Sequence, residues 1–197
     1  MTAQTTRLAE LKRHLRPGRV YRRDDLCRWS KSVDRHAQEL VKDGSLTKLR
    51  NGLYLCPRMS TFGQVPPEDK ELVRSFLKEN DFLITSFNAY NSLGVGTTQL
   101  YKRDVVYNHK RHGIFNLGGR TFDFRRKPRF PRKLTPEFLL VDLLNNLNEL
   151  AEDVDAVRER ALQRVNELDK RALSKAAIEF GKVSTRKLVE KALASSH

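Results

Sequence analysis

Apolar residues recur at helical spacing three times in the first part of the chain. Leu8, Leu11 and Leu15 predict a helix that ends at the Pro-Gly pair of the segment RPGR. A second, short helix is predicted over residues 22–30, because two acidic residues lie in its first turn, where the helix dipole favours them. A third helix is predicted over residues 32–43, since its apolar residues form a single stripe and a glycine follows it.

A hairpin pattern follows the third helix directly. Residues 45–50 and 53–55 form two short runs of alternating apolar residues, and the pair Asn51-Gly52 joins them. This pair tolerates the positive φ angles of a type I′ turn. Three short helices followed by a hairpin are the order of a winged helix-turn-helix domain. We therefore predict a DNA-binding domain of this class over residues 1–57, with the hairpin as its wing.

The rest of the chain predicts a linker and a second domain. Residues 58–69 contain a glycine and a Pro-Pro pair and show little periodicity, which is typical of a linker. Residues 70–197 mix helical and strand-like patterns and end in helices. The predicted fold class is therefore α+β, with an N-terminal winged helix-turn-helix domain and a C-terminal mixed α/β domain that ends in several helices.

The predicted C-terminal domain has its strands in the middle. A helix, a short apolar strand and a second helix ended by Gly94 come first, and alternating strands follow within residues 100–133. Gly118-Gly119 favours a tight turn between two of these strands. Residues 134–197 have the spacing of about four helices, the first of which begins well at Thr135, with a hydroxyl cap and a proline after it.

The net charge of +14 is concentrated in two blocks of the chain. Residues 1–57 carry a net charge of +7 and residues 100–133 a net charge of +9, while the remaining segments are close to neutral. A basic excess of this size indicates an anionic partner such as nucleic acid. Apolar residues make up 39% of the chain, which is enough for one large core or two small ones.

The sequence also carries information on the compartment. It has no apolar run of about 18 residues or more, and the N-terminal segment lacks the apolar core of a signal peptide. Cys27 and Cys56 lack the second pair of ligands that a structural zinc site needs, so both are predicted to be small core residues in a reducing compartment. We expect a cytoplasmic protein that neither spans a membrane nor is exported.

The polar residues of the third helix gather on the face opposite its apolar stripe. At about 100° per residue, the polar side chains fall together on one side, and their donors and amide suit phosphate oxygens and purine edges. Asp34 and Glu39 flank this face, which an ordinary solvated helix would also show, and His36 is predicted to be a packed histidine. The predicted DNA-binding residues of this helix are Lys31, Ser32, Arg35, Gln38 and Lys42.

Cations near the turn of the hairpin and on the second helix complete the predicted DNA interface. A wing lies against the phosphate backbone, so its tip benefits from positive charge. The predicted wing contacts are Lys48, Arg50 and Asn51. Three arginines of the second helix either contact the DNA backbone or keep the surface soluble, and these are Arg22, Arg23 and Arg28.

Two short motifs resemble those of a known family. The pattern G-x-L-x-x-L-R-N-G-L-Y over Gly44–Tyr54 and the segment ITSFNAYNSLGV over Ile84–Val95 resemble the AbiEi-type antitoxins of bacterial type IV toxin–antitoxin systems. The wing pattern matches at Gly44, Arg50, Gly52 and Tyr54. The resemblance implies that the winged helix binds inverted repeats of double-stranded DNA in its own promoter as a repressor. It also implies that the C-terminal domain helps to counter a nucleotidyltransferase-like toxin, although no full family pattern matches there.

The second basic block interleaves cations with aromatic residues on its predicted strands. Such a pattern can clamp single-stranded nucleic acid, but aromatic rings that alternate on a strand are first of all a sheet core. We predict core rings and a cationic surface that faces DNA or RNA. Its members are Lys102, Arg103, Lys110, Arg111, Arg120, Arg125, Arg126, Lys127, Arg129, Arg132 and Lys133.

An enzyme is the competing class of function. A nucleotidyltransferase places two carboxylates after a Gly-Ser pair to hold magnesium, but here only Asp123 follows Gly118-Gly119, and Arg125 stands where the second acid would be. We therefore expect no catalytic site, no metal, no cofactor and no small-molecule substrate. The alternative is a nucleic-acid-processing enzyme or an RNA-binding protein that uses the basic surface of residues 100–133.

Overall fold

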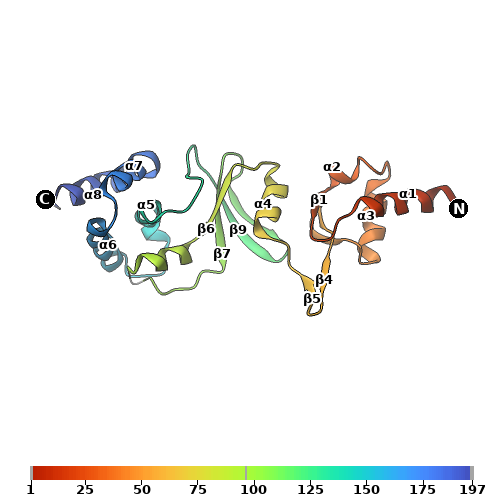
Figure 1. Ribbon diagram of the computed structural model, residues 1–197, viewed down its shortest axis with the longest axis horizontal. Coiled ribbons are helices and arrows are strands. Elements are labelled where there is room, and N and C mark those ends of the chain that lie inside the picture. Colours follow the sequence, from red (N-terminus) through yellow and green to blue (C-terminus); the bar gives the residue numbers. More distant parts are fainter. Residues whose placement is uncertain (1, 96, 196–197) are drawn as a thin grey trace. The chain divides into compact units, whose positions relative to one another are not determined.

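The computed structural model describes residues 2–95 and 97–195, which form two compact units (Figure 1). Unit 1 comprises Met1–Asn80 and Phe115–Arg120, and unit 2 comprises Asp81–Ile114 and Thr121–His197. The sequence predicts a boundary within residues 58–69, whereas the chain leaves unit 1 only after Asn80. Unit 1 also takes up the tip of a later hairpin, which no pattern along the sequence indicates.

Unit 1 begins with the elements that the apolar pattern predicts. The order is α1 (Thr2–His14), β1 (Val20–Arg22), α2 (Arg23–Leu26), α3 (Val33–Lys42), β2 (Thr47–Arg50) and β3 (Leu53–Leu55). The three strands form one antiparallel sheet in the order β1-β3-β2. The three helices and the hairpin are confirmed, whereas β1, which is only three residues long, has no pattern that could reveal it.

The core of this first part of unit 1 is small and contains a buried histidine. Leu11, Leu26 and Leu40 are completely or almost completely buried. The His36 ring is 2% exposed, and its Nδ1 lies 2.8 Å from the Ser30 hydroxyl, which confirms the prediction of a packed histidine. Cys56 is buried as predicted, but the prediction for Cys27 is wrong, because α2 is a single turn and Cys27 lies exposed just beyond it.

The segment predicted as a linker is an ordered hairpin. It contains β4 (Arg58–Ser60) and β5 (Gly63–Val65), which pair antiparallel, and α4 (Asp69–Leu77) follows. Side chains of both strands remain largely accessible, so the hairpin has no alternation of apolar residues to reveal it. In α4, by contrast, Leu72, Val73, Phe76 and Leu77 are buried within unit 1.

Unit 2 has a mixed four-stranded sheet with a short 3-10 helix before its second strand. The elements are β6 (Phe82–Ser86), η1 (Phe87–Leu93), β7 (Arg103–Asn108), β8 (Gly113–Leu117) and β9 (Arg120–Arg126). The strand order is β6-β7-β9-β8, with β6 antiparallel and β9 parallel to β7. The predicted strands are confirmed, and Gly94 ends η1 at a φ of 64°. The predicted helix here is 3-10 rather than α.

Helices make up the rest of unit 2. They are α5 (Pro136–Asn146), η2 (Leu147–Glu149), α6 (Val154–Gln163), η3 (Arg164–Glu167), α7 (Lys170–Phe180) and α8 (Val183–Ala194). The predicted start of α5 is confirmed, since the Thr135 hydroxyl accepts a hydrogen bond from the Phe138 amide and Pro136 occupies the first position. In the described part of the chain, no helix has the length and apolar character to cross a membrane.

A buried carboxylate joins α5 to the sheet and to η1. Asp142 of α5 is 4% exposed and accepts hydrogen bonds from the hydroxyls of Tyr107, at 2.6 Å, and Tyr90, at 2.8 Å. Burial raises the pKa of Asp142, and burial together with the Asp142 carboxylate raises the pKa of both tyrosines. The Asn146 amide donates to the Tyr90 hydroxyl at 3.1 Å and to the Asp142 carbonyl at 2.8 Å. The four groups therefore satisfy one another inside an apolar core.

We expect Tyr107→Phe to lower the free energy of unfolding of unit 2 by about 1–3 kcal/mol at neutral pH, because Asp142 loses a buried donor. The difference in the free energy of unfolding between the wild type and Tyr107→Phe should become smaller above about pH 10. There the unfolded wild type loses a phenol proton that the folded protein keeps, so wild-type stability falls as the pH rises. Urea unfolding followed by circular dichroism measures both effects.

The matched control is Tyr54→Phe, because the Tyr54 hydroxyl makes no hydrogen bond within the described ranges. This control should change the free energy of unfolding by about 0.5 kcal/mol or less. Equal stabilities of the wild type and Tyr107→Phe would show that the buried network does not stabilise unit 2.

Candidate nucleic-acid interface

The polar face of α3 and its flank are open to solvent. Lys31, Arg35, Gln38 and Lys42 are all exposed, while the apolar stripe of the same helix is buried. Within residues 2–95 and 97–195, the side chains of Lys31, Gln38 and Lys42 have no hydrogen-bond or ion-pair partner. Ser32 is exposed at the N-cap of α3, but its side chain makes no capping hydrogen bond. The helix therefore presents three uncommitted polar groups together with Arg35.

Two carboxylates temper the positive charge of this face. Arg35 lies 3.6 Å from Glu39 of the next turn, and both side chains are exposed. The Asp34 carboxylate accepts two hydrogen bonds from the Arg23 guanidinium, at 2.7 and 2.6 Å. The Arg23 hydrogen bonds lower the pKa of Asp34. Arg23 therefore ties α2 to the start of α3, and a phosphate group would have to compete with Asp34 for it.

The turn of the β2–β3 hairpin lies against the start of α2. Gly52 has a φ of 72°, and its carbonyl accepts a hydrogen bond of 2.9 Å from the Arg23 amide. Lys48 and Asn51 are exposed on this hairpin. The predicted contacts are thus accessible, with Lys48 on β2 and Asn51 in a short turn that the Arg23 amide holds from one side.

Arg50 of the same hairpin lies over two aromatic rings of unit 1. Its guanidinium carbon is 4.9 Å from the ring centroid of Phe115 and 5.4 Å from that of Phe76. The two rings lie 5.0 Å apart, so they form one surface for the cation. A guanidinium over a phenyl ring is attracted by the ring quadrupole. The structure therefore gives Arg50 a packing role that the sequence pattern does not reveal.

Arginines on the N-terminal side of unit 1 surround a hollow that sequence reasoning missed. Its volume is about 460 Å³, and Trp29 and Glu71 also line it. Arg22 does not take part: it is half-buried and donates to the Phe76 carbonyl at 3.5 Å. In the sequence, Arg16 and Arg19 on either side of the Pro-Gly turn are the signal that indicates this hollow. The hollow is lined by Arg13, Arg16, Arg19, Arg28 and Arg74.

The second basic block is not one continuous surface. Arg120 belongs to unit 1, where it lies 2.5 Å from Asp69. The Arg125 side chain is only 12% exposed and binds Asp123 at 2.8 Å and Glu149 at 2.5 Å, so it is part of the interior rather than the predicted surface. Arg103 and Lys127 are partly buried. The exposed members of the block in unit 2 are Lys102, Lys110, Arg111, Arg126, Arg129, Arg132 and Lys133.

The aromatic residues of this block are largely in the core, as predicted. Tyr107, Phe122 and Phe124 are buried, while Tyr101 and Phe130 are partly buried against the core of unit 2. Partial burial of Lys127, whose ammonium lies 5.6 Å from the Tyr107 ring centroid, lowers the pKa of that lysine.

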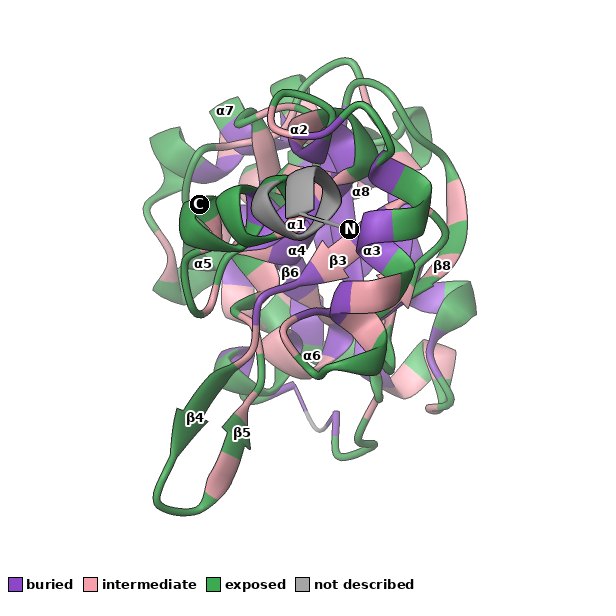
Figure 2. Ribbon diagram, turned by 90° about the vertical axis from the view of Figure 1, so that its right-hand side faces the viewer, coloured by how far each residue is buried: buried purple, intermediate pink, exposed green. Residues whose placement is uncertain are grey.

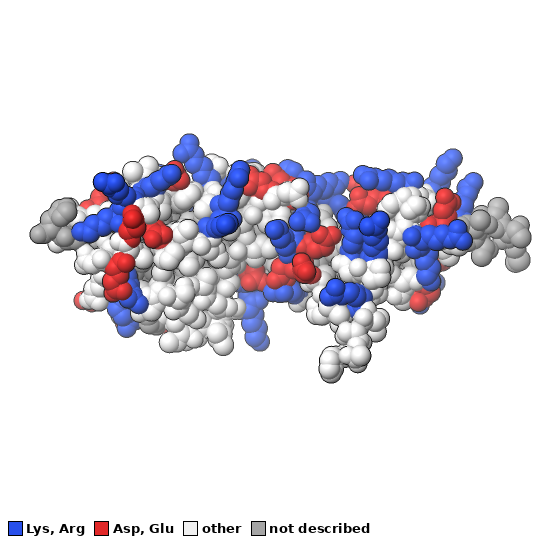
Figure 3. All heavy atoms as spheres, viewed as in Figure 1, with Lys and Arg blue, Asp and Glu red and all other residues white. Residues whose placement is uncertain are grey.

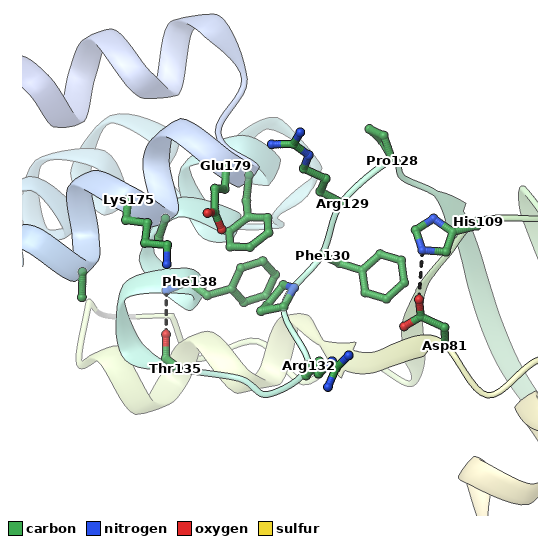
Figure 4. Close-up of a pocket in the computed structure, with 14 residues that line it drawn as sticks. Asp81, His109, Pro128, Arg129, Phe130, Arg132, Thr135, Phe138, Lys175 and Glu179 are labelled. Atoms are coloured by element: carbon green, nitrogen blue, oxygen red, sulfur yellow. Dashed lines mark hydrogen bonds and ion pairs between the residues drawn. The ribbon is translucent and has the colours of Figure 1, made fainter.

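Unit 2 contains an open pocket of about 640 Å³ beside Phe130 (Figure 4). His109 stacks on Phe130 with ring centroids 4.7 Å apart, and its Nε2 lies 3.3 Å from Asp81. The close-up shows Phe130 and Phe138 on neighbouring parts of the wall. Charged groups of both signs line the pocket, namely Asp81, Arg129, Arg132, Lys175 and Glu179. A pocket of this size can hold a small ligand, but the mixed charge does not select one chemical class.

Comparisons with known proteins give a likeness of fold. The chain matches no protein-family model, and no curated protein matches it. Its structure is similar to the crystal structure of the RV2827C protein from Mycobacterium tuberculosis, with a TM-score of 0.55 and 17% sequence identity. The alignment covers 100% of this chain and 78% of that chain. The likeness shows a shared fold over the full length of this chain.

We expect Arg50→Ala to lower the free energy of unfolding of unit 1 by about 0.5–2 kcal/mol, because the cation leaves the two phenyl rings. Lys48→Ala, on the same hairpin, is the matched control and should change stability little, since Lys48 is exposed and has no partner among residues 2–95 and 97–195. Thermal unfolding of both variants measures the effect. Equal losses of stability in the two variants, or no loss of stability in Arg50→Ala, would exclude the packing role of Arg50.

Proposed function

We propose that unit 1 is a winged helix-turn-helix domain that binds double-stranded DNA, and that the protein is an AbiEi-like antitoxin that represses its own promoter. The observation that carries the proposal is the exposed face of α3. The order of three helices and a hairpin supports it, as does the antiparallel sheet β1-β3-β2, because both are typical of winged helices. The net charge of +14 supports a polyanionic partner.

In this proposal α3 lies in the major groove. Gln38 can pair with an adenine edge and Arg35 with a guanine edge, whereas Lys31 and Lys42 at the two ends of the helix contact phosphates. The Arg35–Glu39 pair does not prevent this, because an exposed ion pair contributes only about 0–1 kcal/mol. A guanine edge offers Arg35 two acceptors.

Further cations of unit 1 would hold the DNA backbone. Arg28 and the arginines near the Pro-Gly turn line one hollow, and Arg28 has no side-chain partner in the described ranges. Arg23 contributes indirectly, because its pair with Asp34 fixes the start of α3 relative to α2. Each phosphate contact adds affinity without adding sequence preference.

The antitoxin part of the proposal rests on the resemblance of the segment Ile84–Val95, which lies in unit 2, to AbiEi-type antitoxins. In this role, unit 2 counters a nucleotidyltransferase-like toxin. Co-expression of a candidate toxin, encoded by the neighbouring gene, with the full chain, and with a variant lacking residues 136–195, tests it. Growth rescued by the full chain alone would support the role, and failure of the full chain to rescue would contradict it. An RNA-binding function of the exposed cations at residues 102–133 is the second candidate, since they remain accessible in unit 2.

We expect Gln38→Ala and Arg35→Ala each to weaken binding to the upstream DNA of the protein's own gene by about 1–3 kcal/mol, because each removes a base contact. Binding to scrambled duplex of equal length should change much less. Fluorescence anisotropy at several salt concentrations measures both. Lys187→Ala, an exposed lysine of α8 outside the proposed interface, is the control. Equal loss on both duplexes would contradict base reading by α3.

Lys42→Ala should act differently from these two substitutions. It removes a phosphate contact, so affinity for every duplex should fall alike and the slope of log K against log salt should decrease by about 1. An unchanged slope would place Lys42 outside the interface. A wild-type protein that binds neither duplex would contradict the proposed function as a whole.

A further inference from the structure

The hairpin β4–β5 ends in an exposed aromatic side chain. Phe62 at its turn is 99% exposed, and Met59 on β4 is 70% exposed. Residues 59–65 carry no charge. The hairpin projects from the helices of unit 1 (Figure 2), and the space-filling view shows an uncharged outer part with cations near its base (Figure 3). Large apolar side chains exposed in this way indicate contact with another molecule.

The turn that carries Phe62 is held in one conformation. The Ser60 hydroxyl donates to the Gly63 carbonyl at 3.0 Å and accepts from the Phe62 amide at 3.3 Å. Gly63 has a φ of 106°, which other residues rarely adopt. The Phe62 ring is thus presented on an ordered two-residue turn. The backbone therefore loses little conformational entropy when the ring enters a binding site.

The base of the hairpin is cationic. Arg58 and Arg19 line a hollow of about 320 Å³ where the hairpin joins unit 1, together with Arg74 and Glu68. Arg74 is paired with Glu71 at 3.2 Å. The side chains of Arg58 and Arg19, by contrast, have no partner within the described parts of the chain. The hairpin thus combines an apolar tip, which can stack on a base, with two guanidinium groups at its base, which can bind phosphate groups.

The hairpin is attached close to the proposed DNA-reading helix. It begins three residues after the end of β3, and the Gln64 amide donates to the Thr47 hydroxyl of β2 at 3.5 Å. Thr47 follows the C-terminus of α3 by five residues. Both the hairpin and α3 belong to unit 1.

We infer that β4–β5 is a DNA arm that inserts Phe62 between two base pairs from the minor groove, while Arg58 and Arg19 contact the flanking phosphates. The inference rests on the proposed binding of double-stranded DNA. Apolar wedges of this kind unstack a base step and bend the duplex. The bend brings more backbone onto the protein, which offsets the loss of stacking.

This assignment makes β4–β5 a DNA-contacting hairpin, whereas the sequence predicts β2–β3 as the wing that lies against the phosphate backbone. The turn of β2–β3 has only two residues and is held by the Arg23 amide, and Arg50 lies over Phe76 and Phe115. In contrast, β4–β5 projects freely from unit 1 and carries an apolar tip. A second copy of the chain or a protein partner could also cover Phe62, but neither would need unpaired arginines at the base of the hairpin.

The test compares full-length wild type, Phe62→Ala and Leu100→Ala on the upstream duplex. Leu100 is the matched control, because it is 82% exposed but lies in unit 2. Base unstacking is followed by the fluorescence of 2-aminopurine placed at successive steps, and bending by energy transfer between the ends of the duplex. Wild type and Leu100→Ala should unstack one step and bend the DNA. Phe62→Ala should lose both signals and bind up to about tenfold more weakly.

The outcomes separate the inference from the proposed function. Specific binding by wild type without unstacking or bending, and unchanged in Phe62→Ala, would overturn the inference and leave the proposed function intact. Loss of self-association or of toxin binding in Phe62→Ala, with unchanged unstacking, would also overturn it and assign the hairpin to a protein partner. If wild type binds no duplex, the proposed function fails and the arm fails with it.

Discussion

The partner that each arginine finds within its own unit determines which surfaces remain open to an anion. Arg23 is held by Asp34, Arg125 by Asp123 and Glu149, and Arg120 by Asp69. A guanidinium bound in this way can reach a phosphate only by giving up hydrogen bonds that are already made. Positive charge summed along the chain therefore overstates the surface available for nucleic acid. Among the described residues of unit 1, uncommitted cations lie on α3, near the Pro-Gly turn and at the base of β4–β5, and unit 2 has further exposed cations within residues 102–133.

Arg125 shows how such pairing organises unit 2. Its guanidinium reaches the Asn146 amide oxygen at 3.0 Å as well as the two carboxylates, and Asn146 in turn donates to Tyr90 and Asp142. One arginine of the sheet thus connects the surface acid Glu149 to the buried network of α5. The low local polarity strengthens these hydrogen bonds, and it makes a buried polar group without a partner destabilising. The register of α5 on the sheet is consequently fixed by polar contacts as well as by apolar packing.

The sequence predicts elements well where one pattern dominates. The third helix, the Asn51-Gly52 turn, the strands of unit 2 and the start of α5 at Thr135 all follow from local spacing and turn chemistry. The tip Phe115–Arg120 joins unit 1 through contacts between distant residues, which no local pattern can reveal. Arg50 is exposed as predicted but also lies over Phe76 and Phe115, which are far away in the sequence. Arg125 is drawn into the interior by Glu149, another distant residue, together with nearby Asp123. The hairpin β4–β5 was missed because its exposed strands show no alternation.

The two hairpins of unit 1 differ in what stabilises them. The hairpin β2–β3 completes a three-stranded sheet and buries Leu53 and Leu55, so the fold itself explains it. The hairpin β4–β5 has two strands and buries no large side chain, and an isolated hairpin of this kind is at best marginally stable in water. Its turn hydrogen bonds at Ser60 and its contact at Gln64 keep it ordered, yet it exposes a phenyl ring at the tip. Such a feature adds little to folding and raises the risk of aggregation, so its physical rationale lies in contact outside the unit.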